Sequence, residues 1–71
     1  MNPLNRFAKL RLDYLETSKP QLLISMKNAG LLEAHLRNSQ EYATWELEQL
    51  DLAGMDEEVA EHLVLQEFIL A

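Results

Sequence analysis

A run of 23 residues without glycine or proline, residues 31–53, is the feature that most constrains this chain of 71 residues. The only two glycines, Gly30 and Gly54, bracket it. At a rise of about 1.5 Å per residue, one helix over this run would span roughly 35 Å, the diameter of a small domain. Apolar residues recur along it at helical spacing and predict one buried face: Leu32, Leu36, Ala43, Leu47 and Leu50. We expect a long helix against which the rest of the chain packs.

Two questions about this helix stay open at the level of sequence. Asn38 and Ser39 both favour helix caps, and Asn38 could form a capping pair with Glu41, so a break there is the alternative to a continuous helix. Tyr42 and Trp45 lie off the apolar face, and as an exposed pair they would be a good interaction anchor. In a small bundle such residues more often belong to the core. We expect Trp45 in the core and Tyr42 half exposed.

Shorter helices are expected on both sides of the long one. Asn2 as N-cap and Pro3 at the first helical position predict where the first helix begins. Residues 18–20, Ser-Lys-Pro, end it and open a second, because proline disfavours α geometry in the residue before it. Gly30 is suited to end the second helix, and Asp56 to cap the last one. We therefore predict a single domain, residues 1–71, with an all-α fold of about four helices.

The composition excludes several classes of protein. There is no cysteine, so stability must come from packed helices or a partner, and a reducing cytoplasm is the expected location. No apolar run approaches the roughly 18 residues of a membrane span. His35 and His62 lack helical ligand spacing, and we expect each to be partly buried and hydrogen-bonded rather than metal-bound. No catalytic or phosphate-binding signature is present. We expect no enzymatic activity, no cofactor and no metal.

Charge is divided unevenly along the chain. All six Lys and Arg residues precede residue 38 together with three acids, a net +3, whereas residues 38–71 carry nine acids and no Lys or Arg, a net −9. The acidic residues 38–71 would be attracted to a positively charged surface on a partner and would associate with it faster. The acids expected to contact that partner are Glu41, Glu46, Glu48, Asp51, Asp56, Glu57, Glu58 and Glu61. The alternatives are that the acids pack beside basic helices or only keep the protein soluble.

The last helix is apolar on every side, which is typical of a central helix or a subunit interface. The chain is too short to cover every side of it. We therefore expect a homodimer through Val59, Leu63, Leu65, Phe68, Ile69 and Leu70.

Arg11 and Glu67 each project into an apolar region of their helices. An unpaired buried charge is very costly, so two misfit charges of opposite sign predict one ion pair that joins the first and last helices. The alternative is that the two side chains extend independently to water.

Several segments have a recognisable pattern: residues 11–15 (RLDYL), Lys19-Pro20, residues 30–32 (GLL), His35-Leu36 and the closing residues 60–69. In this pattern the chain resembles the TnpV-like proteins, small proteins encoded by transposons and related mobile elements. Leu23 departs from it, since the family tends to carry an aromatic there, and the segment before the last helix is shorter. The resemblance implies an all-helical fold and a mobile-element or phage setting. It implies no defined activity and no catalytic residues.

Two functions are consistent with these features. The first is a non-catalytic accessory protein whose acidic C-terminal half binds a basic host partner that handles nucleic acid, for example as an inhibitor of a nuclease or defence complex. The alternative is a small DNA-associated regulator, in which residues 21–36 form a weak helix-turn-helix. Its phosphate contacts would be Arg6, Lys9, Lys19, Lys27 and Arg37. The acidic continuation of the long helix opposes this alternative, because DNA would repel it.

Overall fold

The structure, a computed structural model, describes residues 4–71, and within them it is helical with no strand. Four α-helices are present, α1 (Arg6–Ser18), α2 (Pro20–Ala29), α3 (Leu32–Leu52) and α4 (Glu57–Val64), and a π-helical turn, η1 (Leu65–Ile69), continues α4. The predicted all-α bundle built on one long helix is confirmed. The long helix α3 runs without a break through Asn38 and Ser39.

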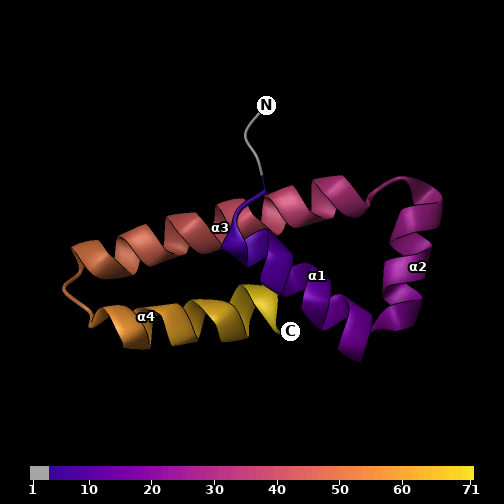
Figure 1. The fold of residues 1–71 in the computed structure, drawn as a ribbon. Coiled ribbons are helices and arrows are strands. Elements are labelled where there is room, and N and C mark those ends of the chain that lie inside the picture. The colour runs from indigo at the N-terminus through magenta and orange to yellow at the C-terminus, as the bar shows by residue number, and fades with distance from the viewer. Residues whose placement is uncertain (1–3) are drawn as a thin grey trace.

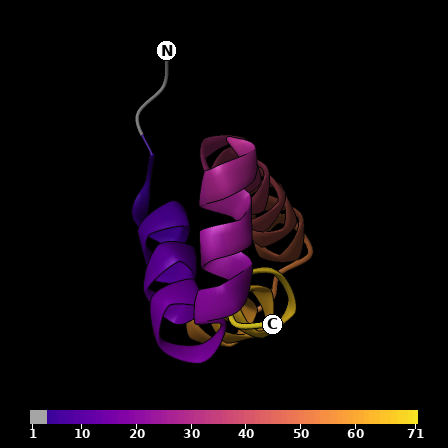
Figure 2. The same ribbon diagram turned by 90° about the vertical axis from the view of Figure 1, so that its right-hand side faces the viewer.

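The helices form a flat bundle, with extents of 41 × 28 × 13 Å between Cα atoms. In Figure 1, α3 runs along the top and α4 returns below it, while α1 crosses obliquely and α2 stands across one end. The view from that end places α2 nearest the viewer, with α1 and α3 on either side behind it (Figure 2). α1 contacts α2, α3 and η1, so the first helix lies between the long helix and the end of the chain.

The core forms where α1, α3 and the last helix meet. Its buried centre consists of Phe7, Ala43, Val64 and Ile69, and partly buried Leu47, Leu50, Leu65 and Phe68 pack around it. The apolar face predicted for the long helix is confirmed, since none of its five residues is exposed. Two polar residues of α3, Ser39 and Gln40, are also buried, which the apolar pattern did not predict.

Three of the predicted helix boundaries are confirmed. Lys19-Pro20 separates α1 from α2, with proline in the first turn of α2. Gly30 ends α2 in the left-handed conformation, at a φ of 72° that disfavours any residue with a Cβ. The carboxylate of Asp56 accepts a hydrogen bond from the backbone N–H of Val59 at 3.3 Å and so caps α4.

The predicted start of the first helix is wrong. Asn2 and Pro3 lie outside the described residues, but α1 begins only at Arg6, and Leu4 and Asn5 are not helical. Asn5 is the N-cap, and its side-chain oxygen accepts from the backbone N–H groups of Phe7 (2.9 Å) and Ala8 (3.4 Å).

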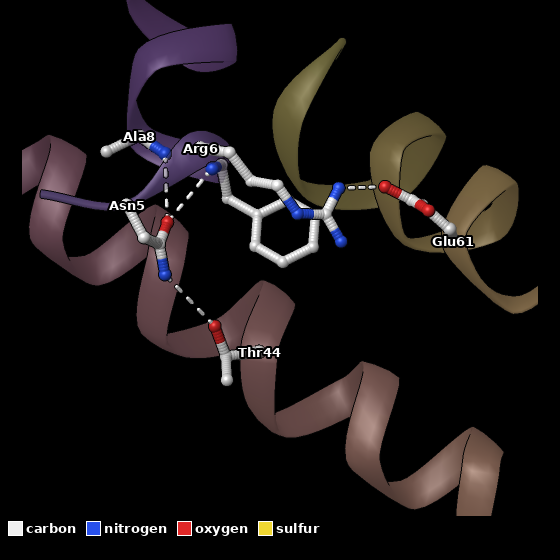
Figure 3. Close-up of polar contacts among 6 residues, drawn as sticks. Asn5, Arg6, Ala8, Thr44 and Glu61 are labelled. Carbon is white, nitrogen blue, oxygen red and sulfur yellow. Dashed lines mark hydrogen bonds and ion pairs between the residues drawn. The ribbon is translucent and has the colours of Figure 1, made fainter. Parts of the chain in front are cut away.

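Contacts with α3 explain why the cap lies at Asn5. Its backbone N–H donates to the side-chain oxygen of Gln40 at 2.7 Å, and its side-chain amide donates to the Thr44 hydroxyl at 3.4 Å. Figure 3 shows this side chain between the start of α1 and Thr44. The cap therefore also joins two helices, and this is why Gln40 can be buried.

Replacing the cap should destabilise the fold. In Asn5→Ala, the N–H groups of Phe7 and Ala8 lose their acceptor, and the free energy of unfolding should fall by about 1 kcal/mol. Urea unfolding followed by circular dichroism measures the change. Asn5→Asp, which keeps an acceptor oxygen, is the control and should lose clearly less. Equal losses in the two variants would contradict the capping role.

Candidate functional site

The guanidinium of Arg11 is buried and connects three parts of the chain. Its Nη1 donates to the backbone oxygens of Ile69 (2.9 Å) and Ala71 (2.7 Å), and its Nε donates to His35 Nε2 at 3.1 Å. The side chain is 7% exposed, and its Cζ lies 5.5 Å from the centre of the Tyr14 ring. Arg11 therefore ties α1 to α3 and to the residues at and beyond η1.

The predicted ion pair between Arg11 and Glu67 is wrong. Arg11 does join the first and last helices, but through backbone oxygens, and Glu67 is exposed. The prediction assumed an α-helix up to residue 70. In the π-helical turn the N–H of Leu70 instead bonds the oxygen of Leu65, five residues back, at 2.7 Å. That wider turn changes which side chains face the core, and it leaves Ile69 O and Ala71 O to accept from Arg11.

His35 is neutral in this arrangement. Because Arg11 can only donate, the Nε2 atom of His35 must act as acceptor, and the ring proton is then on Nδ1. Burial of the ring, and next the nearby charge of Arg11, lower the pKa of His35 below its ordinary value of 6.5. The sequence-based expectation of a partly buried histidine with a hydrogen-bonded neighbour is confirmed for His35, whereas His62 is exposed.

Removing the Arg11 guanidinium should cost much of the stability of so small a domain. In Arg11→Met, the oxygens of Ile69 and Ala71 lose their donor, and the free energy of unfolding should fall by about 3 kcal/mol. Glu67→Gln, at an exposed position, should change it by less than about 0.5 kcal/mol. In a double-mutant cycle the two changes should add. A coupling free energy of more than about 1 kcal/mol between the two substitutions would show that Arg11 and Glu67 do form an ion pair.

The lowered pKa of His35 predicts that acid destabilises the fold. Unfolded His35 takes up a proton near pH 6.5, whereas folded His35 does so only at lower pH, so the unfolded state binds more protons in between. This contribution to stability is complete above pH 6.5 and is lost as the pH falls from there to the folded pKa. Urea unfolding between about pH 7.5 and 5.5 measures the slope, because carboxylates with ordinary pKa values stay ionised there. His35→Gln should flatten the slope and His62→Gln should not. The reverse result would contradict the assignment.

The outward face of α3 carries the largest exposed aromatic side chains of the described residues. Trp45 is 58% exposed and Tyr42 is 62% exposed. The prediction that Trp45 lies in the core is therefore wrong. Ala43, two residues away, is buried against α1 and the last helix, and a shift of two residues turns a side chain to nearly the opposite side of a helix. No described helix covers that opposite side.

Trp45 lies between two open hollows. The first, of about 430 Å³, has a mainly polar lining: Asn5, Arg37, Gln40, Glu41, Thr44, Trp45 and Glu48. The second, of about 550 Å³, has a mainly apolar lining: Asn38, Glu41, Tyr42 and Trp45. The Tyr42 ring stacks on Phe68 of η1 at 6.2 Å between ring centres and 10° between planes, so one wall of the second hollow is held by the core.

The eight predicted partner-binding acids lie in different surroundings. Glu41 and Glu48 are exposed and line the hollows beside Trp45. Asp51, Glu57 and Glu58 are exposed but line neither hollow, Glu46 is half-buried, and Asp56 caps α4. Glu61 forms an ion pair with Arg6 (Figure 3). We call Glu41, Tyr42, Trp45 and Glu48 the Trp45 face.

Several basic residues of the N-terminal half are paired with acids of the same chain or buried. Arg6 pairs with Glu61, Arg11 is buried, and Arg37 bonds the carboxylate of Glu33 at 3.0 Å. Lys9, Lys19 and Lys27 are exposed. A DNA-binding surface would thus retain three of the five predicted phosphate contacts without an ion pair inside the described part of the fold.

One predicted dimer residue is excluded from any interface. Ile69 is completely buried within the chain. Leu65 and Phe68 are partly buried against the core, and Val59, Leu63 and Leu70 are between 41% and 51% exposed. Homodimerisation through the exposed three stays a prediction.

Within residues 4–71, no three His, Cys, Asp or Glu side chains gather as a metal site, and no helix has the length and apolarity to cross a membrane. Comparison of the chain with protein-family models, curated proteins and solved structures gives no match.

Proposed function

We propose that this protein is a non-catalytic interaction protein that binds a basic partner through the Trp45 face. The observation that carries the proposal is the exposure of Trp45, 58%, in the middle of an acidic helix face. A tryptophan side chain stabilises a protein mainly when its large ring is buried, so an exposed one contributes little to the stability of the fold. Tryptophan is also among the residues that most often dominate the binding energy of interfaces.

The charges beside Trp45 indicate the kind of partner. Glu41 and Glu48 make no hydrogen bond or ion pair within residues 4–71, so both carboxylates are available to a partner. A formal net charge of −6 for the whole chain would speed association with a positive surface and make it sensitive to salt.

The resemblance to TnpV-like proteins supports a mobile-element or phage setting for this binding. Basic surfaces are common on host proteins that handle nucleic acid, because such proteins must contact phosphates. An acidic protein that occupies this surface excludes the nucleic acid. We therefore propose an inhibitor of a host nuclease or defence complex as the specific form of the function, at a location in the cytoplasm.

The alternative of a small DNA-associated regulator receives less support. In a helix-turn-helix reading, α2 and α3 would be the two helices, and the outward residues at the start of α3 would face the bases. Those residues include Glu33, which pairs with Arg37, and Glu41 follows Glu33 about two turns further along α3. Carboxylates at these positions would repel phosphates.

Partner capture from the host tests the proposal. The unmodified protein should retain a specific nucleic-acid-handling protein, with weaker capture at higher salt and release by added DNA or RNA. Trp45→Ala should weaken capture at least about tenfold, as expected for an interface hot spot. Glu41→Lys with Glu48→Lys should abolish it, because two attractive charges become repulsive.

The matched control is Asp13→Lys with Glu16→Lys. It changes the net charge by the same amount at two exposed positions of α1, away from the Trp45 face. Capture by this variant should persist. Equal capture by the Trp45-face variants and the control would contradict the proposal. A shift of duplex DNA by the unmodified protein at physiological salt would favour the DNA-associated alternative.

A further inference from the structure

The second hollow of the Trp45 face is built from one strip of α3. Asn38, Glu41, Tyr42 and Trp45 follow one another at intervals of three, one and three residues, a spacing that places all four on one side of a helix. Two aromatic side chains form its walls. A carboxylate and an amide supply its acceptors. Its volume, about 550 Å³, is within the range of about 300–1,000 Å³ common for small-ligand pockets.

The walls of this hollow differ in how they are held. Tyr42 stacks on Phe68, which itself packs on the core, so the ring is positioned before any partner arrives. Trp45 and Glu41 make no polar side-chain contact within the described residues and present an indole face and a carboxylate to the solvent. An aromatic face attracts a cation, and a carboxylate beside it accepts the hydrogen bonds of that cation.

Elsewhere in the same chain, a cation is already held between an aromatic ring and a carboxylate. The Arg6 guanidinium lies 4.4 Å from the centre of the Phe7 ring and also pairs with Glu61 on α4. Figure 3 shows Arg6 reaching across from α1 to this glutamate. An aromatic ring and a carboxylate together thus bind an arginine side chain at the surface of this protein.

We infer that the hollow between Tyr42 and Trp45 binds an arginine side chain of the basic partner, with the guanidinium over the indole and its N–H groups on Glu41. This inference rests on the proposed function and specifies the chemistry of its contact. A planar guanidinium can stack on the ring while its edge donates to the carboxylate and to the Asn38 amide oxygen. The compact ammonium of lysine, which is more strongly hydrated, cannot do both as well.

The only tryptophan of the chain reports on this site directly. The full-length protein is titrated with three short peptides that differ at one position, arginine, lysine or uncharged citrulline, while Trp45 fluorescence and its indole N–H resonance are followed. The arginine peptide should bind at least about threefold more tightly than the lysine peptide, with the citrulline peptide weakest. Amide shifts should centre on residues 38–45.

Two substitutions of equal charge separate this site from the acidic face in general. Glu41→Gln should weaken the arginine peptide at least about threefold, whereas Glu57→Gln, at an exposed position outside the Trp45 face, should leave its affinity nearly unchanged. Trp45→Leu should bind the arginine and lysine peptides with equal affinity. Because this variant has no indole, its binding is followed by the backbone amide shifts.

Equal binding of the arginine and lysine peptides, or equal losses in the two glutamine variants, would overturn the inference and leave a diffuse acidic face that still suits the proposed function. Absence of any shift would also overturn it. The proposed function is contradicted by a different result: the Trp45-face variants capture the host partner as well as the unmodified protein does.

Discussion

The buried guanidinium of Arg11 joins α1, α3 and the residues at the end of η1 by hydrogen bonds, in addition to the apolar core that these segments share. With no cysteine, the end of the chain is fastened to α1 and α3 through the oxygens of Ile69 and Ala71 and the ring of His35. Arginine suits this position because it stays charged and offers several donors in a fixed plane. A buried charge is tolerable only when its donors are satisfied, and here the backbone and a neutral histidine supply the acceptors.

This fastening determines which side of α3 is covered. Because η1 is drawn against α1, both segments pack on the face of α3 that carries Ala43, and the core closes there with Phe7 and Ile69. The opposite face of the helix receives no cover from the described residues. The exposure of Trp45 is thus a consequence of how the small core is completed, and the same core positions Tyr42 through its stacking on Phe68.

The fold also redistributes the charge that the sequence divides so unevenly. Arg6 and Arg37 pair with glutamates of the chain, and Arg11 is removed from the surface. The acids beside Trp45 keep no partner within residues 4–71. The expectation that acids pack beside basic helices therefore holds at Glu61, which pairs with Arg6 of α1, whereas Glu41 and Glu48 are exposed on α3. Binding energy in such a surface comes mainly from the buried aromatic contact, with the charges guiding association.

Features that depend on residues a few positions apart could be predicted from the sequence. The length and continuity of α3, its apolar face, and the boundaries at Lys19-Pro20, Gly30 and Asp56 all follow from local backbone preferences and helical spacing. The cap at Asn5, the acceptors of Arg11, the burial of Ile69 and the exposure of Trp45 do not. Each of these depends on which helix covers which face, through contacts between residues 24 or more positions apart or through the absence of a covering helix. Helical periodicity in the sequence shows on which face of a helix a residue lies. Only the packing of the helices in the bundle decides whether that face contacts protein or water.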